Sequence, residues 1–134
     1  MHEVVVSRFI SASPAELASV LGPRQLVEYE GSFTVESVDE RDAATVVTAS
    51  GPGLAFELRF EQRADGWYYE QAGEAGPFET METTVTVDRE NEGSQVTMHS
   101  QVGLAIPLPF SDRIAGWKRR GELERALDSL AAEC

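Results

Sequence analysis

The stretch from Gly31 to Leu104 constrains the fold most, because its apolar residues recur at every second position. Turn-forming clusters divide the stretch at Asp39 to Asp42, Gly51 to Gly53, Asp65-Gly66, Gly73 to Pro77 and Glu90 to Gly93. This pattern predicts six antiparallel strands in succession. In one of them the apolar residues Leu54, Phe56, Leu58 and Phe60 alternate with charged ones, so we expect one buried and one solvated face.

The last predicted hairpin can be checked by its register. A loop at Glu90 to Gly93 pairs Arg89 with Ser94. The pairs on one face are then Val87 with Val96, Val85 with Met98, Thr83 with Ser100, and Met81 with Val102. The other face carries Glu82, Thr84 and Thr86 opposite Gln101, His99 and Thr97. Both strands agree on the apolar face, which supports the register.

Helical signals flank the strands. A first strand over Val4 to Phe9 precedes Ser13-Pro14-Ala15-Glu16, which supplies an N-cap, a proline at the first helical position and a capping box. This helix ends at Gly22-Pro23, and a second short helix is expected over 24–29. After Pro107 to Pro109, a helical pattern runs to about Ala132, with Ile114, Trp117, Leu123, Leu127 and Leu130 on one stripe. Gly116 and Gly121 within it predict close packing or a bend.

Composition narrows the class of protein. The 134 residues fit one domain, 1–134, and contain neither a signal peptide nor an apolar run that could span a membrane, so we expect a cytoplasmic protein. A net charge of -12 argues against nucleic-acid binding. The acidic excess, with Lys118 as the only lysine, favours adaptation to concentrated salt, as in a halophilic archaeon; a GC-rich genome is the alternative.

The order of strand, two short helices, six strands and a long final helix resembles the START-like (SRPBCC) helix-grip superfamily. The opening residues 7–17 and Gly76-Pro77-Phe78, followed by alternating Met81, Thr83, Val85 and Val87, resemble its polyketide-cyclase and coenzyme Q-binding branch. The resemblance implies an α+β fold: a curved antiparallel sheet of about seven strands around the C-terminal helix, with an apolar cavity between them. Val85 departs from the bulky aromatic that relatives often carry there.

The apolar faces predict which side chains line this cavity. From the sheet we expect Phe56, Leu58, Phe60, Trp67, Tyr69, Met81, Val85, Met98 and Val102, and from the final helix Ile114 and Trp117. We expect the cavity beside the N-terminal half of that helix, under the loops at Gly51 to Gly53 and Gly76 to Phe78. A two-residue turn at Asp65-Gly66 places Trp67, Tyr69 and Gln71 inward. A three-residue turn from Ala64 would instead place Tyr68 and Glu70 inward.

Candidate chemistry is sparse. Glu70 is the weak catalytic candidate, since a carboxylate in an apolar cavity would have a raised pKa. His99 is expected on the outer face, His2 lies near the terminus, and Cys134 is the last residue, so no metal site and no cofactor are predicted. The remaining basic feature is the final helix, with Arg113, Lys118, Arg119, Arg120 and Arg125.

Three functions follow as hypotheses. The first is a non-enzymatic carrier of a hydrophobic small molecule: a lipid, an isoprenoid quinone or a polyketide-like compound. The second is a cyclase or dehydratase that uses Glu70 as acid or base. The third is a protein-interaction module that binds an anionic partner through the basic helix. An ionisable group inside the cavity is the observation that separates the enzyme from the carrier.

Overall fold

The structure is a computed structural model that describes residues 2–73, 75–104 and 111–134. Its elements in chain order are β1 (His2–Ile10), α1 (Pro14–Val20), α2 (Pro23–Glu30), β2 (Thr34–Arg41), β3 (Ala44–Gly51), β4 (Leu54–Arg63), β5 (Gly66–Ala72), β6 (Thr80–Glu90), β7 (Gly93–Gly103) and α3 (Ser111–Glu133). The expected α+β architecture of two short helices, an antiparallel sheet and a long final helix is confirmed. The predicted break at Pro107 to Pro109 lies outside the described residues.

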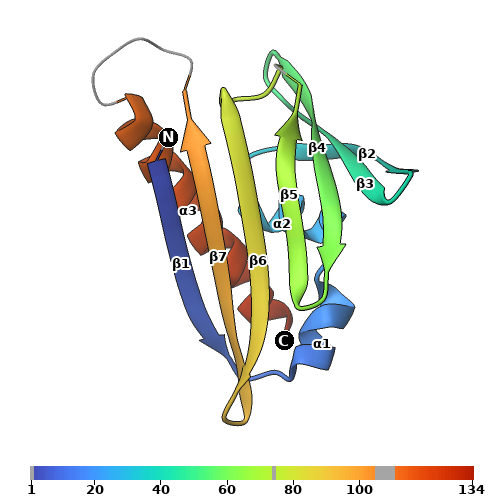
Figure 1. Cartoon of the computed structure of the whole chain (residues 1–134), viewed down its shortest axis with the longest axis vertical. Coiled ribbons are helices and arrows are strands. Elements are labelled where there is room, and N and C mark those ends of the chain that lie inside the picture. Colours follow the sequence, from blue (N-terminus) through green and yellow to red (C-terminus); the bar gives the residue numbers. More distant parts are fainter. Residues whose placement is uncertain (1, 74, 105–110) are drawn as a thin grey trace.

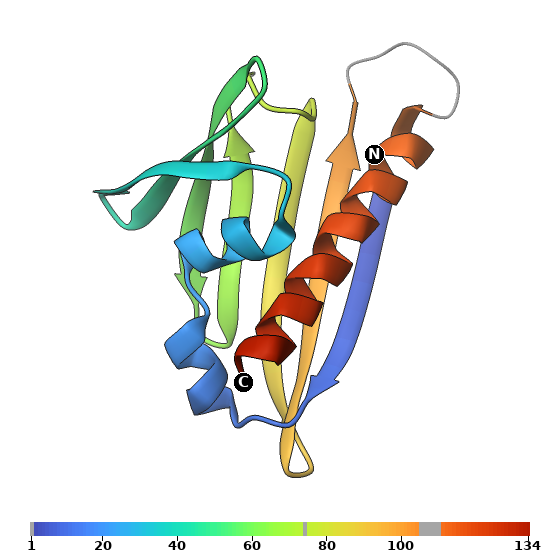
Figure 2. The same cartoon turned by 180° about the vertical axis from the view of Figure 1, so that it is seen from behind.

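One antiparallel sheet holds all the described strands, in the order β1-β7-β6-β5-β4-β3-β2 (Figure 1). The three helices lie on the same face of this sheet, and α3 runs obliquely along it (Figure 2). α3 packs against β1, β7 and α2. The strands β2 and β3 curl over at the far side, so that α2 lies between them and α3 (Figure 2). The sheet therefore wraps around a layer of helices.

Local sequence explains where the helices begin and end. The Ser13 hydroxyl accepts a hydrogen bond from the Glu16 amide at 3.1 Å, and the Glu16 carboxylate accepts one from the Ser13 amide, which closes the predicted capping box. α2 begins at Pro23, the second residue of the predicted Gly22-Pro23 break, with Gly22 as its N-cap. It ends at Gly31, whose φ of 78° is the left-handed conformation that glycine adopts without strain. This end places Glu30 at the last position of α2.

The two hairpins test the register predictions. β6 and β7 pair as expected, from Met81 with Val102 to Arg89 with Ser94. In the β4–β5 hairpin the predicted Asp65-Gly66 turn is wrong, because Arg63 pairs with Gly66 and the turn residues are Ala64 and Asp65. Gly66 is instead part of β5, where a Cβ would lie 1.8 Å from the Val85 carbonyl oxygen. The register differs by two residues, which preserves the face, so Trp67, Tyr69 and Gln71 still point inward.

The rotation of α3 about its axis differs from the prediction in its N-terminal half. Ile114 is 59% exposed and Trp117 is 79% exposed, so the expectation that they form the helix wall of the cavity is wrong. Ala115, Gly116 and Arg119 face the sheet in their place. A Cβ on Gly116 would lie 2.1 Å from the His2 ring, which confirms close packing there. At Gly121 the nearest atom would be 3.5 Å away, so space does not require a glycine.

Candidate functional site

A buried arginine occupies the centre of the space between the helices and the sheet. Arg119 of α3 is 1% exposed. Its Nε donates to the Ser100 hydroxyl at 3.1 Å. Nη1 donates to Glu30 Oε1 at 2.6 Å and to Glu122 Oε1 at 3.0 Å. Nη2 donates to Glu30 Oε2 at 3.1 Å, to the Tyr69 hydroxyl at 3.1 Å and to Thr83 Oγ1 at 2.7 Å.

We call these six residues the Arg119 cluster: Arg119, Glu30, Glu122, Tyr69, Thr83 and Ser100. Five elements contribute to it. The end of α2 supplies Glu30, and Glu122 follows Arg119 by about one turn of α3. β5 supplies Tyr69, and the register of β6 and β7 places Thr83 directly opposite Ser100, with their hydroxyls 2.9 Å apart. The cluster therefore depends on contacts between segments that are far apart in the chain.

The charges of the cluster nearly balance. Arg119 faces the two carboxylates of Glu30 and Glu122, and Lys118 lies beside the second of them, with its Nζ 3.2 Å from Glu122 Oε2. The Ser32 hydroxyl also donates to Glu122. Lys118 is half-exposed, so the fully buried part of the network has one more carboxylate than cations.

These contacts shift the pKa values of the buried groups. Burial alone would raise the pKa of the Glu122 carboxyl, but Arg119, Ser32 and Lys118 outweigh burial and lower it. Burial also favours a neutral arginine, yet the charge of Glu30 raises the pKa of Arg119 well above its ordinary value. The pKa of the Tyr69 hydroxyl is raised by burial and by the neighbouring Glu30 carboxylate, to which it donates a hydrogen bond. The ionisable groups of the cluster are thus two carboxylates, a guanidinium and a neutral phenol.

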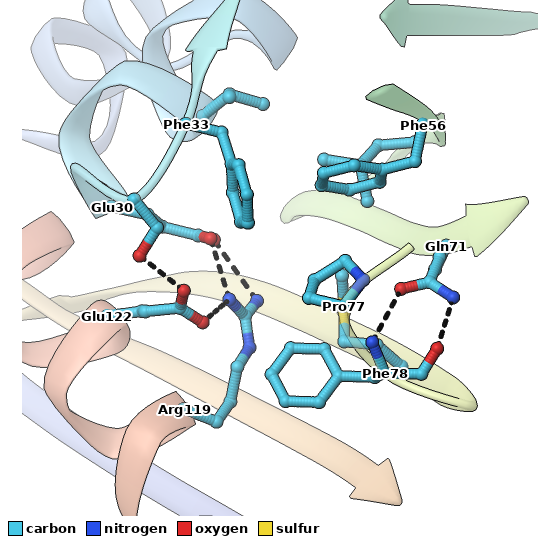
Figure 3. A pocket seen from close by; sticks show the side chains of 12 residues that line it. Glu30, Phe33, Phe56, Gln71, Pro77, Phe78, Arg119 and Glu122 are labelled. Carbon is cyan, nitrogen blue, oxygen red and sulfur yellow. Dashed lines mark hydrogen bonds and ion pairs between the residues drawn. The ribbon is translucent and has the colours of Figure 1, made fainter. Parts of the chain in front are cut away.

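A pocket opens beside the cluster (Figure 3). Glu30, Arg119 and Glu122 form one side, and the other sides are mostly apolar. Its lining residues are Val27, Glu30, Ser32, Phe33, Phe56, Leu58, Gln71, Pro77, Phe78, Met81, Arg119 and Glu122. The cavity volume is about 20 Å³, enough for one water-sized group. This pocket is therefore far smaller than the expected ligand-sized cavity of ~300 to 1,000 Å³.

The segment 75–79 between β5 and β6 covers one side of the pocket, and the Gln71 side chain holds it there. Gln71 Nε2 donates to the Phe78 carbonyl oxygen at 2.6 Å, and Gln71 Oε1 accepts from the Phe78 amide at 3.2 Å. The amide of Gln71 thus bonds the Phe78 backbone as a neighbouring strand would. A Cβ on Gly76 would lie 2.0 Å from the Gln71 side-chain amide, so a larger residue there would displace this amide from Phe78. Pro77 and Phe78 are thereby placed over the pocket.

Among the predicted ligand-binding residues, Phe56, Leu58 and Met81 line this pocket. Phe60, Tyr69, Val85, Met98 and Val102 are buried in the core but are not part of the lining. Trp67 lies at the other end of the sheet, in a separate hollow between α1 and the β4–β5 hairpin. Ile114 and Trp117 lie on the solvent face of α3.

The catalytic candidate Glu70 does not reach the pocket. It lies opposite Glu82 on the outer face of the sheet, and the Tyr68 hydroxyl donates to it at 3.0 Å. The prediction that required Glu70 to point inward is wrong. Tyr69 pairs with the buried Phe60 and points inward, so its neighbour Glu70 points to the opposite face. His99 is also on the outer face, 41% exposed, with its Nε2 3.1 Å from Glu3. No group of three or more metal-ligating side chains occurs within the described residues.

The sequence reasoning missed Glu30, Arg119 and Glu122, the three charged residues of the cluster. A search for apolar periodicity treats charged helix positions as solvated, so it assigned Arg119 to the exposed basic face. One signal was available: Thr83 and Ser100 face each other on the predicted apolar face of the last hairpin. Two buried hydroxyls need polar partners, and these predict a polar side chain from the helix above them.

The curved antiparallel sheet around a long C-terminal helix defines a START-like, helix-grip protein. The sequence over residues 1–134 matches the family of "Polyketide cyclase / dehydrase and lipid transport" proteins, and the chain belongs to this family. A search of curated proteins gave no match. Across the described ranges, none of the helices is long and apolar enough to cross a membrane.

Solved structures with the same fold cover nearly the whole chain. A START superfamily protein from Mycobacterium smegmatis has a TM-score of 0.75 and 12% identity, over 99% of this chain and 97% of that chain. A protein from Thermus thermophilus has a TM-score of 0.70 and 21% identity, over 98% and 95%. The di-domain ARO/CYC protein BexL has a TM-score of 0.67 and 20% identity, over 94% of this chain and 45% of that chain. At these identities the likeness shows the fold alone.

Proposed function

We propose that this protein binds and carries a hydrophobic small molecule in the pocket between the sheet, segment 75–79 and α3. The observation that carries the proposal is the lining of that pocket. Phe33, Phe56, Leu58, Phe78 and Met81 form apolar walls that lead to the charged Arg119 cluster. Apolar walls with a few convergent polar groups are typical of small-molecule sites. The expected ligand therefore has an apolar body and one polar end.

The ligand classes under consideration are lipids, isoprenoid quinones and polyketide-like compounds. The family description names both polyketide cyclases and lipid transport, which supports the first and the last of these. The likeness to the ARO/CYC protein BexL points in the same direction as the polyketide class. Glu70, the expected acid or base of a cyclase or dehydratase, is outside the pocket. Ionisable groups do line the pocket, namely Glu30, Arg119 and Glu122. We favour the carrier because both of these carboxylates are paired with Arg119.

Binding requires the pocket to open, because a volume of about 20 Å³ does not admit a ligand of this kind. Segment 75–79 is a part of the wall that lies outside the helices and strands, and a backbone bond from the Glu79 amide to the Gly103 carbonyl oxygen at 2.8 Å attaches its end to β7. The two Gln71 bonds hold it, and the Phe78 ring closes over the cluster side of the pocket (Figure 3). The half-exposed Lys118 lies nearby, with its Nζ 5.7 Å from the Phe33 ring centre and 5.8 Å from that of Phe78. Displacement of Phe78 would join the cavity to solvent.

Two experiments test the proposal. Native mass spectrometry of the protein purified from its own host should detect a co-purified small molecule. Phe56→Glu should abolish binding, because it places a charge without a partner in the apolar wall, whereas Val38→Glu on the exposed surface of β2 should leave binding unchanged. Equal binding by Phe56→Glu and the wild type would contradict a site in this pocket. Neither tryptophan lines the pocket, so isothermal calorimetry is preferred to tryptophan fluorescence.

A second candidate function is favoured by the exposed face of α3. Trp117 and Ile114 are the most exposed large apolar residues of the described chain, and Lys118 and Arg120 lie beside Trp117 around a surface hollow. This face offers an apolar contact framed by positive charge, which suits an acidic protein partner. Titration with an acidic peptide should change Trp117 fluorescence in a Trp67→Phe variant, and the change should weaken with salt. An unchanged spectrum would contradict this second function.

A further inference from the structure

Arg119 has no free N–H group to donate to a ligand in the pocket. A guanidinium has five N–H groups. The single N–H on Nε is bonded to Ser100 and the two on Nη1 to Glu30 and Glu122. The two on Nη2 meet three acceptors: Glu30, Tyr69 and Thr83. A carbonyl or carboxylate on a ligand would have to displace one of these bonds in order to contact Arg119.

The hydroxyl groups around the pocket are also committed as donors. The Tyr69 hydroxyl donates to Glu30, and the Ser32 hydroxyl donates to Glu122. Gln71 keeps one N–H beyond the bond it donates to Phe78, but it lies across the pocket from the carboxylates (Figure 3). Lys118 is half-exposed and donates to Glu122 Oε2 at 3.2 Å, but it is not part of the pocket lining.

The two carboxylates, in contrast, keep capacity to accept. A carboxylate can accept about four hydrogen bonds. Glu30 accepts from Arg119 on both oxygens and from Tyr69. Glu122 accepts from Arg119, Ser32 and Lys118. Each therefore has room for about one more donor, and the adjoining cavity has the volume of one water-sized group.

The charge balance points the same way. Within the described residues, Arg119 is the one buried cation beside two buried carboxylates, so the buried part of the network has one negative charge in excess. The cations that offset this charge lie nearer the solvent: the half-exposed Lys118, and Arg125, whose Nη2 donates to the Ser32 hydroxyl at 3.2 Å. An anionic head group would add a third negative charge in a place with little water. Like charges at short distance in such a site are strongly disfavoured.

We propose that the pocket selects a ligand whose polar end is a hydroxyl group, an alcohol or a phenol on an apolar body, over a carboxylate or an ester of the same length. The inference rests on the proposed function, since it concerns the polar end of the same pocket. The hydroxyl donates to Glu30 or Glu122 and fills the water-sized space beside them. A hydrogen bond to a charged group is among the stronger ones in proteins, so the preference is expected to be about ten- to a hundred-fold in Kd.

The test compares three probes that differ only at the polar end: dodecanol, dodecanoate and methyl dodecanoate, each titrated into the full chain by calorimetry at about pH 8. We choose this pH so that the fatty acid is ionised. Dodecanol is expected to bind ten- to a hundred-fold more tightly than the other two. Equal or tighter binding of dodecanoate or of the ester overturns the inference and leaves the proposed function standing. If none of the three binds, the proposed function falls, and the inference falls with it.

Two variants test whether the Arg119 cluster causes the preference for a hydroxyl group. Glu122→Gln replaces one acceptor oxygen by an NH₂ donor and removes the excess charge, so the ester and the carboxylate should gain affinity relative to dodecanol. Glu124→Gln is the matched control: it makes the same change on the exposed face of α3 and should keep the wild-type preference. An unchanged preference in Glu122→Gln overturns the assignment. If that variant does not fold, the three-probe series on the wild type decides.

Discussion

The guanidinium of Arg119 and the carboxylate of Glu30 meet at two points in the interior, with Nη1 2.6 Å from Oε1 and Nη2 3.1 Å from Oε2. The two residues are 89 positions apart in the chain. Their pairing joins the end of α2 to the middle of α3, and the same guanidinium bonds β6 and β7 through Thr83 and Ser100. One side chain thus fixes the distance between the helices and the sheet at the pocket.

Arg119→Met should strongly destabilise the fold. It leaves Glu30 and Glu122 buried without their cation, and breaking a buried pair in this way costs about 3–5 kcal/mol. Urea denaturation gives the free energy of unfolding. Arg119→Lys should recover only part of the loss, because an ammonium cannot form the two-point contact. Arg120→Met, on the exposed neighbour, should change stability by no more than about 0.5 kcal/mol, and a loss as large as that of Arg119→Met would contradict the role of the pair.

Glu122 should make the protein sensitive to acid. Its pKa is lower in the folded state than in the unfolded chain, so its contribution to stability is complete above the unfolded pKa of about 4.3 and is lost as the pH falls through the folded pKa. The fall in the free energy of unfolding between about pH 6 and about pH 3 should therefore be smaller in Glu122→Gln than in the wild type. Glu124→Gln should keep the wild-type slope. Identical slopes in all three proteins would show that another group causes the acid loss.

Tyr69 should limit stability at high pH. Its pKa is raised in the folded state, so the neutral hydroxyl stabilises the fold fully below the unfolded pKa of about 10, and this stabilisation is lost as the pH rises through the folded pKa. The Tyr69 absorbance should therefore show tyrosinate only when circular dichroism shows unfolding. Tyr69→Phe should flatten the alkaline fall in stability, at the cost of one hydrogen bond to Glu30. Ionisation of Tyr69 in the folded protein would contradict the buried pair.

The sequence was sufficient to predict the sheet because its strands have two distinct faces. Alternation and turn residues predicted the β6–β7 register correctly. The turn between β4 and β5 was misplaced, but the inward face of β5 was still predicted correctly because the register differs by two residues. The rotation of α3 could not be predicted in the same way. Ala115, Gly116 and Arg119 face inward there, and none is a large apolar residue, whereas Ile114 and Trp117 face solvent.

The candidate site was predicted only in its apolar half. Phe56, Leu58 and Met81 follow from alternation within single strands. The charged half depends on Glu30 meeting Arg119, a contact between segments that no local pattern relates. The cavity volume could not be predicted either, since it depends on how closely Phe33 and Phe78 approach the cluster, and side chains in a packed interior leave few voids larger than a water molecule.

Salt should stabilise the protein. A net charge of -12 repels itself, and ions shorten the range of this repulsion to about 3 Å near 1 M salt. The melting temperature is expected to rise between about 0.1 M and about 3 M KCl, in keeping with the proposed adaptation to concentrated salt. Tetramethylammonium chloride at the same ionic strength is a useful comparison for effects specific to potassium. A flat or falling melting temperature would contradict this adaptation.

Gln71 should control how fast a ligand enters and leaves. Gln71→Ala removes both bonds to the Phe78 backbone, so segment 75–79 should open more often. Entry and exit use the same opening, so stopped-flow association and dissociation rates should rise together, with a smaller change in Kd than in either rate. Gln101→Ala, a half-buried glutamine of β7 paired with Glu82 on the outer face, is the matched control and should leave both rates unchanged. If Gln71→Ala changes only the dissociation rate, the side chain contacts the ligand and does not hold the segment closed, because a gate affects both directions of passage.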